Sequence, residues 1–258
     1  MTHSSYFAVL QYDGTHFAGW QRQPEARTVQ GEFEAALTRL DGHHTPVHAA
    51  GRTDAGVHAV GQVVSFTRAR KWDAEDLRRA LDANTPPDIW IAAAGHAPAG
   101  FHARKDAIAR RYRYVVGCDE ASGSPFRRPF EWALRTPLDG DLLDAAAGCF
   151  TGEHDFRPLS TVGQTKRHYR CVVGISAWQK RVDHQGFIFT IEADRFLHRM
   201  VRFLVGIMVD VGRGRRPLED VTQLLTRHSN QEASPPAPPQ GLYLVCARYP
   251  QLELGRCS

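Results

Sequence analysis

The chain has 258 residues, of which 42% are hydrophobic and 23% are charged, and its formal net charge is +4 at pH 7. These values are typical of a soluble globular protein and argue against a disordered or fibrous chain. The most apolar segment, residues 203–209, is too short to span a bilayer, so we expect no membrane span, and no signal peptide is evident. The five Cys residues are scattered without zinc-ligand spacing, and we expect reduced thiols in a cytoplasmic protein.

The first half of the chain has the hydrophobic spacing of six elements in the order β-α-β-β-α-β. One helix is expected to begin at Thr28 and to run to about Leu40, and a second is expected to begin at Asp73, its predicted N-cap. Alternating or continuous apolar residues predict the strands, at 6–12, 47–51, 59–67 and 89–97.

The second half repeats this order. Its predicted strands are 111–117, 169–179, 186–194 and 241–249, and its predicted helices are 139–150, 196–211 and 217–227. A split β-α-β pattern written twice predicts an α+β fold of two ferredoxin-like halves. Two such antiparallel sheets side by side would leave a cleft between the halves, and we expect the active site in that cleft. The halves are predicted to be residues 1–106 and 107–258.

The stretch GRTDAGVHA, residues 51–59, places one carboxylate, Asp54, in a tight turn. A turn that only reverses the chain needs no more than Asn-Gly or Asp-Gly. Chain reversal alone therefore does not explain the Arg and His residues around Asp54. Further along, a helix over 195–206 would put Arg195, Arg199 and Arg202 on one face. Arg202 precedes seven uncharged residues, and a half-buried Arg requires an anionic partner, for which Asp54 is a candidate.

Two other stretches combine aromatic and polar or cationic side chains. YDGTHFAGWQRQ, residues 12–23, is either a loop with core aromatic residues or a loop that contacts RNA. In RRYRY, residues 110–114, strand alternation puts Arg111 and Arg113 on one face and Tyr112 and Tyr114 on the other. The residues alone favour a core strand with a basic outer face over a Tyr ring that stacks on a base.

Several kinds of site are disfavoured by the sequence. The cluster of His43, His44 and His48 lacks the helical spacing of a metal site, and we expect no metal. There is no Gly-rich phosphate loop and no Gly-x-Ser-x-Gly elbow.

Taken together, GRTDAGVHA, YDGTHFAGWQRQ, FHAR, RRYRY, FLHRMVR and APPQGLYL resemble the bacterial tRNA pseudouridine synthase A family over nearly the whole chain. The resemblance implies an isomerase that converts uridine to pseudouridine at positions 38 to 40 of the tRNA anticodon arm. It implies two α+β halves whose sheets join into one extended sheet, and it implies a homodimer. It also implies that no cofactor or metal is needed.

The resemblance also implies roles for individual residues. Asp54 would be the catalytic aspartate, Tyr112 would stack on the target uracil, and Arg202 would pair with Asp54. Arg52 would keep the target base flipped out, and Leu242 would form an apolar wall of the uracil pocket. Residues that would contact tRNA are Phe101, His102, Arg104, Lys105, Lys166 and Arg167.

This chain departs from the family pattern after Arg167, where relatives often have Thr or Pro. A non-catalytic RNA-binding protein or RNA chaperone is the alternative function. It explains the Arg clusters, but it does not explain a carboxylate inside a basic turn, because that carboxylate repels phosphate.

Overall fold

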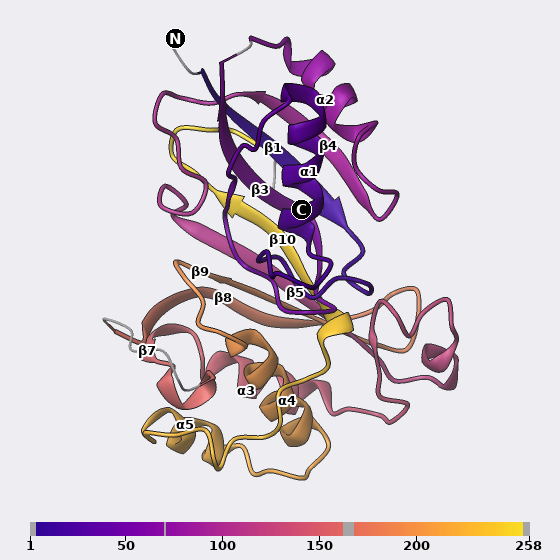
Figure 1. Cartoon of the computed structure of the whole chain (residues 1–258). Helices are drawn as coiled ribbons and strands as arrows, with labels where there is room; N and C mark the ends of the chain where they lie inside the picture. The colour runs from indigo at the N-terminus through magenta and orange to yellow at the C-terminus, as the bar shows by residue number, and fades with distance from the viewer. Residues whose placement is uncertain (1–3, 70, 162–167, 255–258) are drawn as a thin grey trace. The chain divides into compact units, whose positions relative to one another are not determined.

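The computed structural model describes residues 4–69, 71–161 and 168–254 (Figure 1). These described residues fall into two compact units, one within 1–110 together with 243–258 and the other within 111–242. The sequence-based division gave all of 107–258 to the second half. The two divisions differ because the last strand, β10 (Leu242–Arg248), pairs in parallel with a strand of the first unit. In that pairing Tyr243 lies opposite His58.

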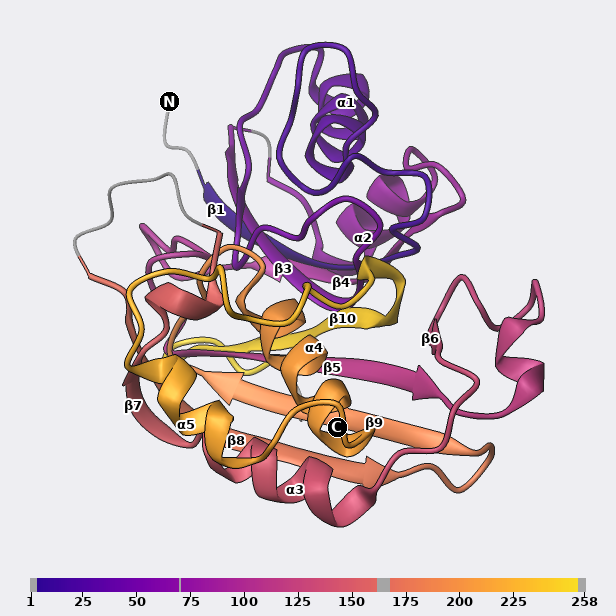
Figure 2. The same ribbon diagram turned by 90° about the horizontal axis from the view of Figure 1, so that it is seen from below.

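The first unit is a sheet with two helices on one face (Figure 2). The sheet order is β4-β1-β3-β10, with β2 added at β3, and β1 runs antiparallel to both of its neighbours. Its other elements are β1 (Ser4–Tyr12), α1 (Val29–Asp41), β2 (His48–Ala49), β3 (His58–Arg68), α2 (Ala74–Asp82) and β4 (Ile89–His96).

Both helices of this unit begin where their capping residues predict. The side chain of Thr28 accepts a hydrogen bond from the backbone N–H of Gly31, and Asp73 accepts bonds from the N–H groups of Glu75 and Asp76. The apolar faces of α1 and α2 are buried against the sheet through Phe33, Leu37, Leu77 and Leu81.

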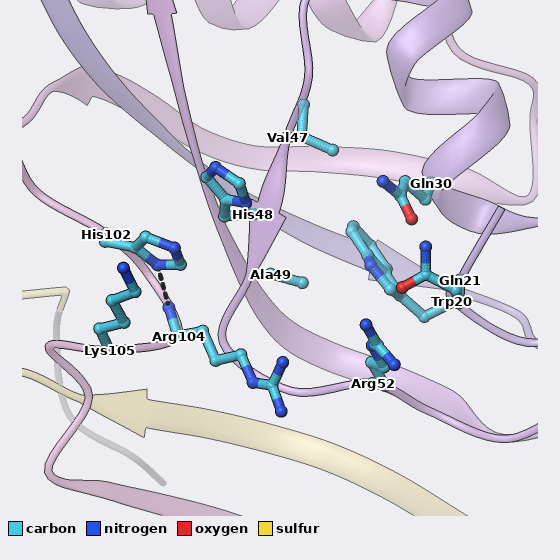
Figure 3. A pocket seen from close by; sticks show the side chains of 10 residues that line it. All are labelled: Trp20, Gln21, Gln30, Val47, His48, Ala49, Arg52, His102, Arg104 and Lys105. Atoms are coloured by element: carbon cyan, nitrogen blue, oxygen red, sulfur yellow. Dashed lines mark hydrogen bonds between the residues drawn. The ribbon is translucent and has the colours of Figure 1, made fainter.

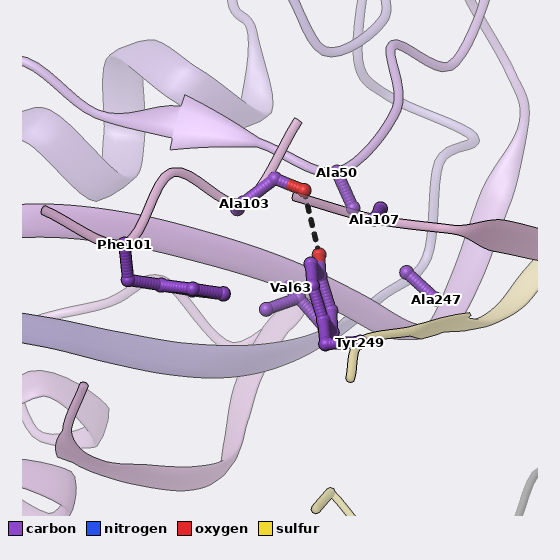
Figure 4. Packing of buried hydrophobic residues seen from close by; sticks show 7 residues of the cluster. All are labelled: Ala50, Val63, Phe101, Ala103, Ala107, Ala247 and Tyr249. Atoms are coloured by element: carbon purple, nitrogen blue, oxygen red, sulfur yellow. Dashed lines mark hydrogen bonds between the residues drawn. The ribbon is translucent and has the colours of Figure 1, made fainter. Parts of the chain in front are cut away.

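The opposite face of the same sheet has its own core (Figure 4). This second core can form because the residues of a strand alternate between the two faces of the sheet. Val63 therefore points away from the helices, while Phe66 points toward them. The hydroxyl of Tyr249 donates a hydrogen bond to the carbonyl oxygen of Ala103 at 2.7 Å, which ties the segment after β4 to the C-terminal strand region. The buried cluster is Ala50, Val63, Phe101, Ala103, Ala107, Ala247 and Tyr249.

The second unit has the sheet order β5-β9-β8-β7, with β6 paired to β5. Its α3 packs against α4 and β8. The elements are β5 (Ala109–Gly117), β6 (Trp132–Ala133), α3 (Gly140–Gly148), β7 (Gly152–Asp155), β8 (Arg170–Lys180), β9 (Gly186–Ala193), α4 (Met200–Gly212) and α5 (Glu219–Leu225). The α+β class with two split β-α-β halves is thus confirmed.

The start of α4 corrects one prediction. The helix begins at Met200 and not at 196, because Arg199 has a left-handed backbone with φ of 60°. Arg195 and Arg199 therefore precede the helix, and the predicted shared helical face with Arg202 does not exist.

Two further observations concern the expectations about membrane spans and cysteine thiols. Among the described residues, no helix combines the length and hydropathy needed to cross a membrane. Cys118, Cys149 and Cys171 are free thiols, in agreement with the expectation for these three residues.

Candidate functional site

The turn that carries Asp54 lies between β2 and β3 in the first unit. Its backbone closes through a hydrogen bond from the N–H of Val57 to the carbonyl oxygen of Asp54, at 3.2 Å. Gly56, with φ of 76°, supplies the left-handed conformation that such a turn requires. Asp54 is half-buried and Arg52 is exposed. The tight turn around a carboxylate that the sequence predicts is therefore present.

The loop that follows β1 packs against this turn. The N–H of Trp20 donates to the carbonyl oxygen of Thr53 at 3.0 Å, and the N–H of Gly56 donates to the carbonyl oxygen of Phe17 at 3.3 Å. The motifs YDGTHFAGWQRQ and GRTDAGVHA, which are about 40 residues apart in the sequence, thus form one interlocked structure.

Glycine makes this close approach possible. A Cβ atom at Gly14 would lie 2.1 Å from the carbonyl oxygen of Val57, and one at Gly19 would lie 2.8 Å from that of Thr53. No side chain fits at such distances, so both positions require glycine.

Side chains anchor the turn at both ends. Before Asp54, the hydroxyl of Thr53 lies 2.8 Å from the hydroxyl of Tyr12, and burial raises the pKa of Tyr12 to about 12. After Asp54, Nδ1 of His58 accepts a hydrogen bond from the N–H of Gly14 at 3.0 Å, and the His58 ring stacks on Tyr243. Asp54 is thereby held on a rigid support.

A cavity of about 380 Å³ opens beside Arg52. Figure 3 shows Trp20, Gln21 and Gln30 along one side and His48 and His102 along the opposite side, with the guanidinium groups of Arg52 and Arg104 at the lower rim. The remaining lining residues are Val47, Ala49 and Lys105.

Two histidines form one wall of this cavity. The rings of His48 and His102 stack with centroids 4.3 Å apart and an angle of 15° between their planes. Nδ1 of His102 accepts a hydrogen bond from the backbone N–H of Arg104 at 3.2 Å. Burial, and next the charges of His48 and Lys105, lower the pKa of His102, which favours its neutral form at neutral pH.

The residues predicted to contact RNA divide into three groups. His102, Arg104 and Lys105 all line the cavity. Phe101 is buried in the core, with its ring edge-on against that of Tyr249, and its contact with tRNA stays a prediction. Lys166 and Arg167 lie outside the described residues.

The aromatic residues of the 12–23 loop follow the core interpretation. Tyr12, Phe17 and Trp20 are 4%, 3% and 2% exposed. Of the three, only Trp20 lines the cavity. The residues that sequence reasoning missed here are His48, Gln30 and Thr53. In the sequence His48 stands out only as a candidate metal ligand, because its pairing with His102 depends on a tertiary contact.

In the second unit, Tyr112, Arg202 and Leu242 are the predicted substrate-binding residues. Tyr112 is 7% exposed, and its ring meets that of Phe196 edge-on at 4.9 Å. Leu242 is also buried, at the start of β10. The predicted alternation on β5 is observed, because Tyr112 and Tyr114 are buried while Arg111 and Arg113 are half-buried and Arg111 pairs with Glu192 at 2.9 Å.

Arg202 is fixed by backbone groups of the proline-rich segment that precedes β10. Its Nε donates to the carbonyl oxygen of Ala237 at 2.7 Å, and the N–H of Ala237 donates back to the carbonyl oxygen of Arg202 at 2.9 Å. The neighbouring Tyr114 hydroxyl donates to the carbonyl oxygen of Pro238. Burial raises the pKa of Tyr114 well above its usual value. The pairing of Arg202 with Asp54 stays a prediction, because the two residues belong to different units.

Comparisons with known proteins point to one family. The profile of the tRNA pseudouridine synthase family matches residues 8–104 and 146–250. A tRNA pseudouridine synthase A of Moorella thermoacetica is 42% identical and aligns with 93% of this chain and 98% of its own length. Proteins of the same name from Nostoc sp. and Listeria welshimeri are 39% and 40% identical, over 94% and 93% of this chain and 85% and 96% of their own lengths.

Proposed function

Because the chain belongs to the tRNA pseudouridine synthase family, we propose that it isomerises uridine to pseudouridine at positions 38 to 40 of the tRNA anticodon arm. The observation that carries the proposal is the rigid turn of Asp54, a half-buried carboxylate that follows by two residues Arg52, which lines a cavity rimmed by cations. Cations bind the RNA backbone, and a fixed carboxylate supplies the chemistry.

The reaction needs few groups. The N1–C1′ bond breaks, the uracil turns, and C5 bonds to C1′ while the C5 proton leaves and N1 gains a proton. Product and substrate are isomers, so no electrons and no water enter the balance. The carboxylate of Asp54 either attacks C1′ or removes the C2′ proton, and in both cases it acts as an anion held against the sugar.

Access to C1′ requires that the nucleotide leave the base stack. In our proposal Arg52 keeps the target base flipped out. Tyr112 stacks on the uracil, Leu242 forms an apolar wall, and the guanidinium of Arg202 faces the carboxylate of Asp54. Burial of Tyr112 and Leu242 supports a dry pocket, and the two backbone hydrogen bonds at Ala237 support a fixed Arg202.

We further propose that the protein acts in the cytoplasm as a homodimer, as the resemblance implies. Sedimentation equilibrium tests the oligomeric state: the expected mass is about twice the 28.9 kDa of the chain, and a monomer at all concentrations contradicts it.

Tritium release tests the activity. Transfer RNA labelled at C5 of uridine should lose tritium when incubated with the protein, in the presence of EDTA, because the C5 proton leaves during isomerisation. A tRNA with cytidine at positions 38 to 40 is the matched control and should keep its label. Binding without release would favour the RNA-chaperone alternative, and release that stops with EDTA would contradict the metal-free mechanism.

A further inference from the structure

We infer that the cavity beside Arg52 holds a second nucleotide of the RNA, one that is unpaired and lies next to the target uridine in the RNA chain. The inference rests on the proposed function for the identity of the ligand as RNA. The cavity, at about 380 Å³, has the size of sites that enclose small molecules.

The apolar surfaces of the cavity suit a nucleobase. Its floor is formed by Val47 and Ala49, both buried, and Trp20 lies beside them. On the opposite side, the stacked His48 and His102 rings give a flat aromatic wall, and His48 is exposed. Unstacked bases bind between such surfaces with little dependence on sequence.

The charges at the rim suit a phosphate. Arg52, Arg104 and Lys105 form no ion pair with any described carboxylate, whereas Arg27 and Arg78 of the same unit are paired with Asp88 and Glu75. Three cations around one opening repel each other unless an anion joins them. Arginine forks in particular match phosphate oxygens.

The occupant is not the target uridine itself. Asp54 does not line the cavity, and no other carboxylate does, so chemistry at a sugar cannot occur there. Arg52 lines the cavity only two residues before Asp54 in the chain. This sequence proximity is why we assign the cavity to a nucleotide adjacent to the target.

The test is a scan of abasic sites. Anticodon stem-loop RNAs, each with one unpaired nucleotide made abasic, are titrated against four full-length proteins: wild type, His48→Ala, Ala49→Leu and the control Lys71→Gln. His48→Ala removes an exposed side chain, Ala49→Leu fills the floor, and Lys71 is an exposed cation that does not line the cavity. Circular dichroism and thermal melting verify the fold of each.

For the wild type and Lys71→Gln, we expect an abasic site at one position adjacent to the target to weaken binding by about 5- to 150-fold, the range for loss of one stacked base. In His48→Ala and Ala49→Leu the loss at that position should shrink, because the base contact is already gone. No sensitive position in the wild type, or an unchanged profile in His48→Ala, would overturn the inference. Pseudouridine formation on intact RNA is measured separately, so a lack of activity would contradict the proposed function while leaving the binding profile to decide the inference.

Discussion

The hydroxyl groups of Tyr12 and Thr53 lie 2.8 Å apart in the interior of the first unit. Tyr12 is the last residue of β1, and Thr53 directly precedes Asp54. This hydrogen bond links the candidate catalytic turn to the end of β1, so the position of the carboxylate depends on a residue that is only 4% exposed.

Replacing Tyr12 by Phe should therefore both destabilise the protein and slow the reaction. The Thr53 hydroxyl would be left buried without its partner, which lowers the free energy of unfolding by about 1–3 kcal/mol. Urea unfolding measures this change. The double variant Tyr12→Phe/Thr53→Val removes both polar groups and should recover part of the lost stability. A Tyr12→Phe protein as stable and active as the wild type would contradict the anchoring role.

Gly14 offers a steric test of the interlocked motifs. A Cβ at this position would lie 2.1 Å from the carbonyl oxygen of Val57, so Gly14→Ala must displace the Asp54 turn. We expect a clear drop in melting temperature and in turnover. Gly148→Ala, at the end of α3, is the matched control: its Cβ would meet nothing within 4 Å, and it should be neutral or slightly stabilising. Equal effects of the two substitutions would argue against the contact.

The sequence predicted local features of this fold well. Helix starts at Thr28 and Asp73 are confirmed, because a capping side chain bonds to backbone groups only two or three residues away. The missed strand β7, Gly152–Asp155, has no apolar alternation and exists only because it pairs with β8. Likewise, the left-handed backbone of Arg199 has no signal in the sequence, since non-Gly residues rarely adopt it.

Tertiary proximity explains what could not be predicted at the site. Asp54, His102, Arg104 and Lys105 were all named from motifs, but the sequence did not indicate that the last three share a cavity with Trp20 and His48. The assignment of β10 to the first unit also depends on its pairing with β3, a contact between residues nearly 200 positions apart.

His102 should make stability depend on pH. Burial lowers the pKa of His102 below its ordinary value of 6.5, so the unfolded chain takes up a proton at a higher pH than the folded protein does. The free energy of unfolding must then fall as the pH falls from about 6.5 toward the folded pKa. Above about pH 6.5, His102 is neutral in both states and adds no pH dependence to stability. We expect His102→Gln to lose less stability than the wild type between about pH 7.5 and 5.5. Urea unfolding at the two values measures it, and identical losses would refute the assignment.

Arg104 should account for part of the salt dependence of RNA binding. Each phosphate contact contributes about −0.7 to −0.9 to the slope of log K against log salt. Arg104→Gln should make the slope shallower by about that amount if the side chain meets one phosphate. Arg78→Gln is the control, because Arg78 is already paired with Glu75 at 2.8 Å and does not line the cavity. The prediction fails if the two variants change the slope equally.

Asp54→Asn is the most direct test of the chemistry. The substitution keeps the size of the side chain but removes the negative charge, and the backbone bonds that fix the turn remain available. Loss of a carboxylate from a basic surface removes a repulsion of phosphate, so tRNA affinity should stay equal or rise slightly. Turnover should fall by several orders of magnitude, as it does when an essential nucleophile or base is lost.

The measurement pairs single-turnover pseudouridine formation with a binding titration on the same tRNA, after the melting temperature has shown that the variant is folded. Asp13→Asn serves as the comparison, because Asp13 is a half-buried carboxylate in the adjoining loop that is assigned no chemical role. It should retain most of the wild-type rate. If Asp54→Asn keeps even about a tenth of the wild-type rate, the carboxylate cannot be the group that acts at the sugar, because removal of such a group leaves far less.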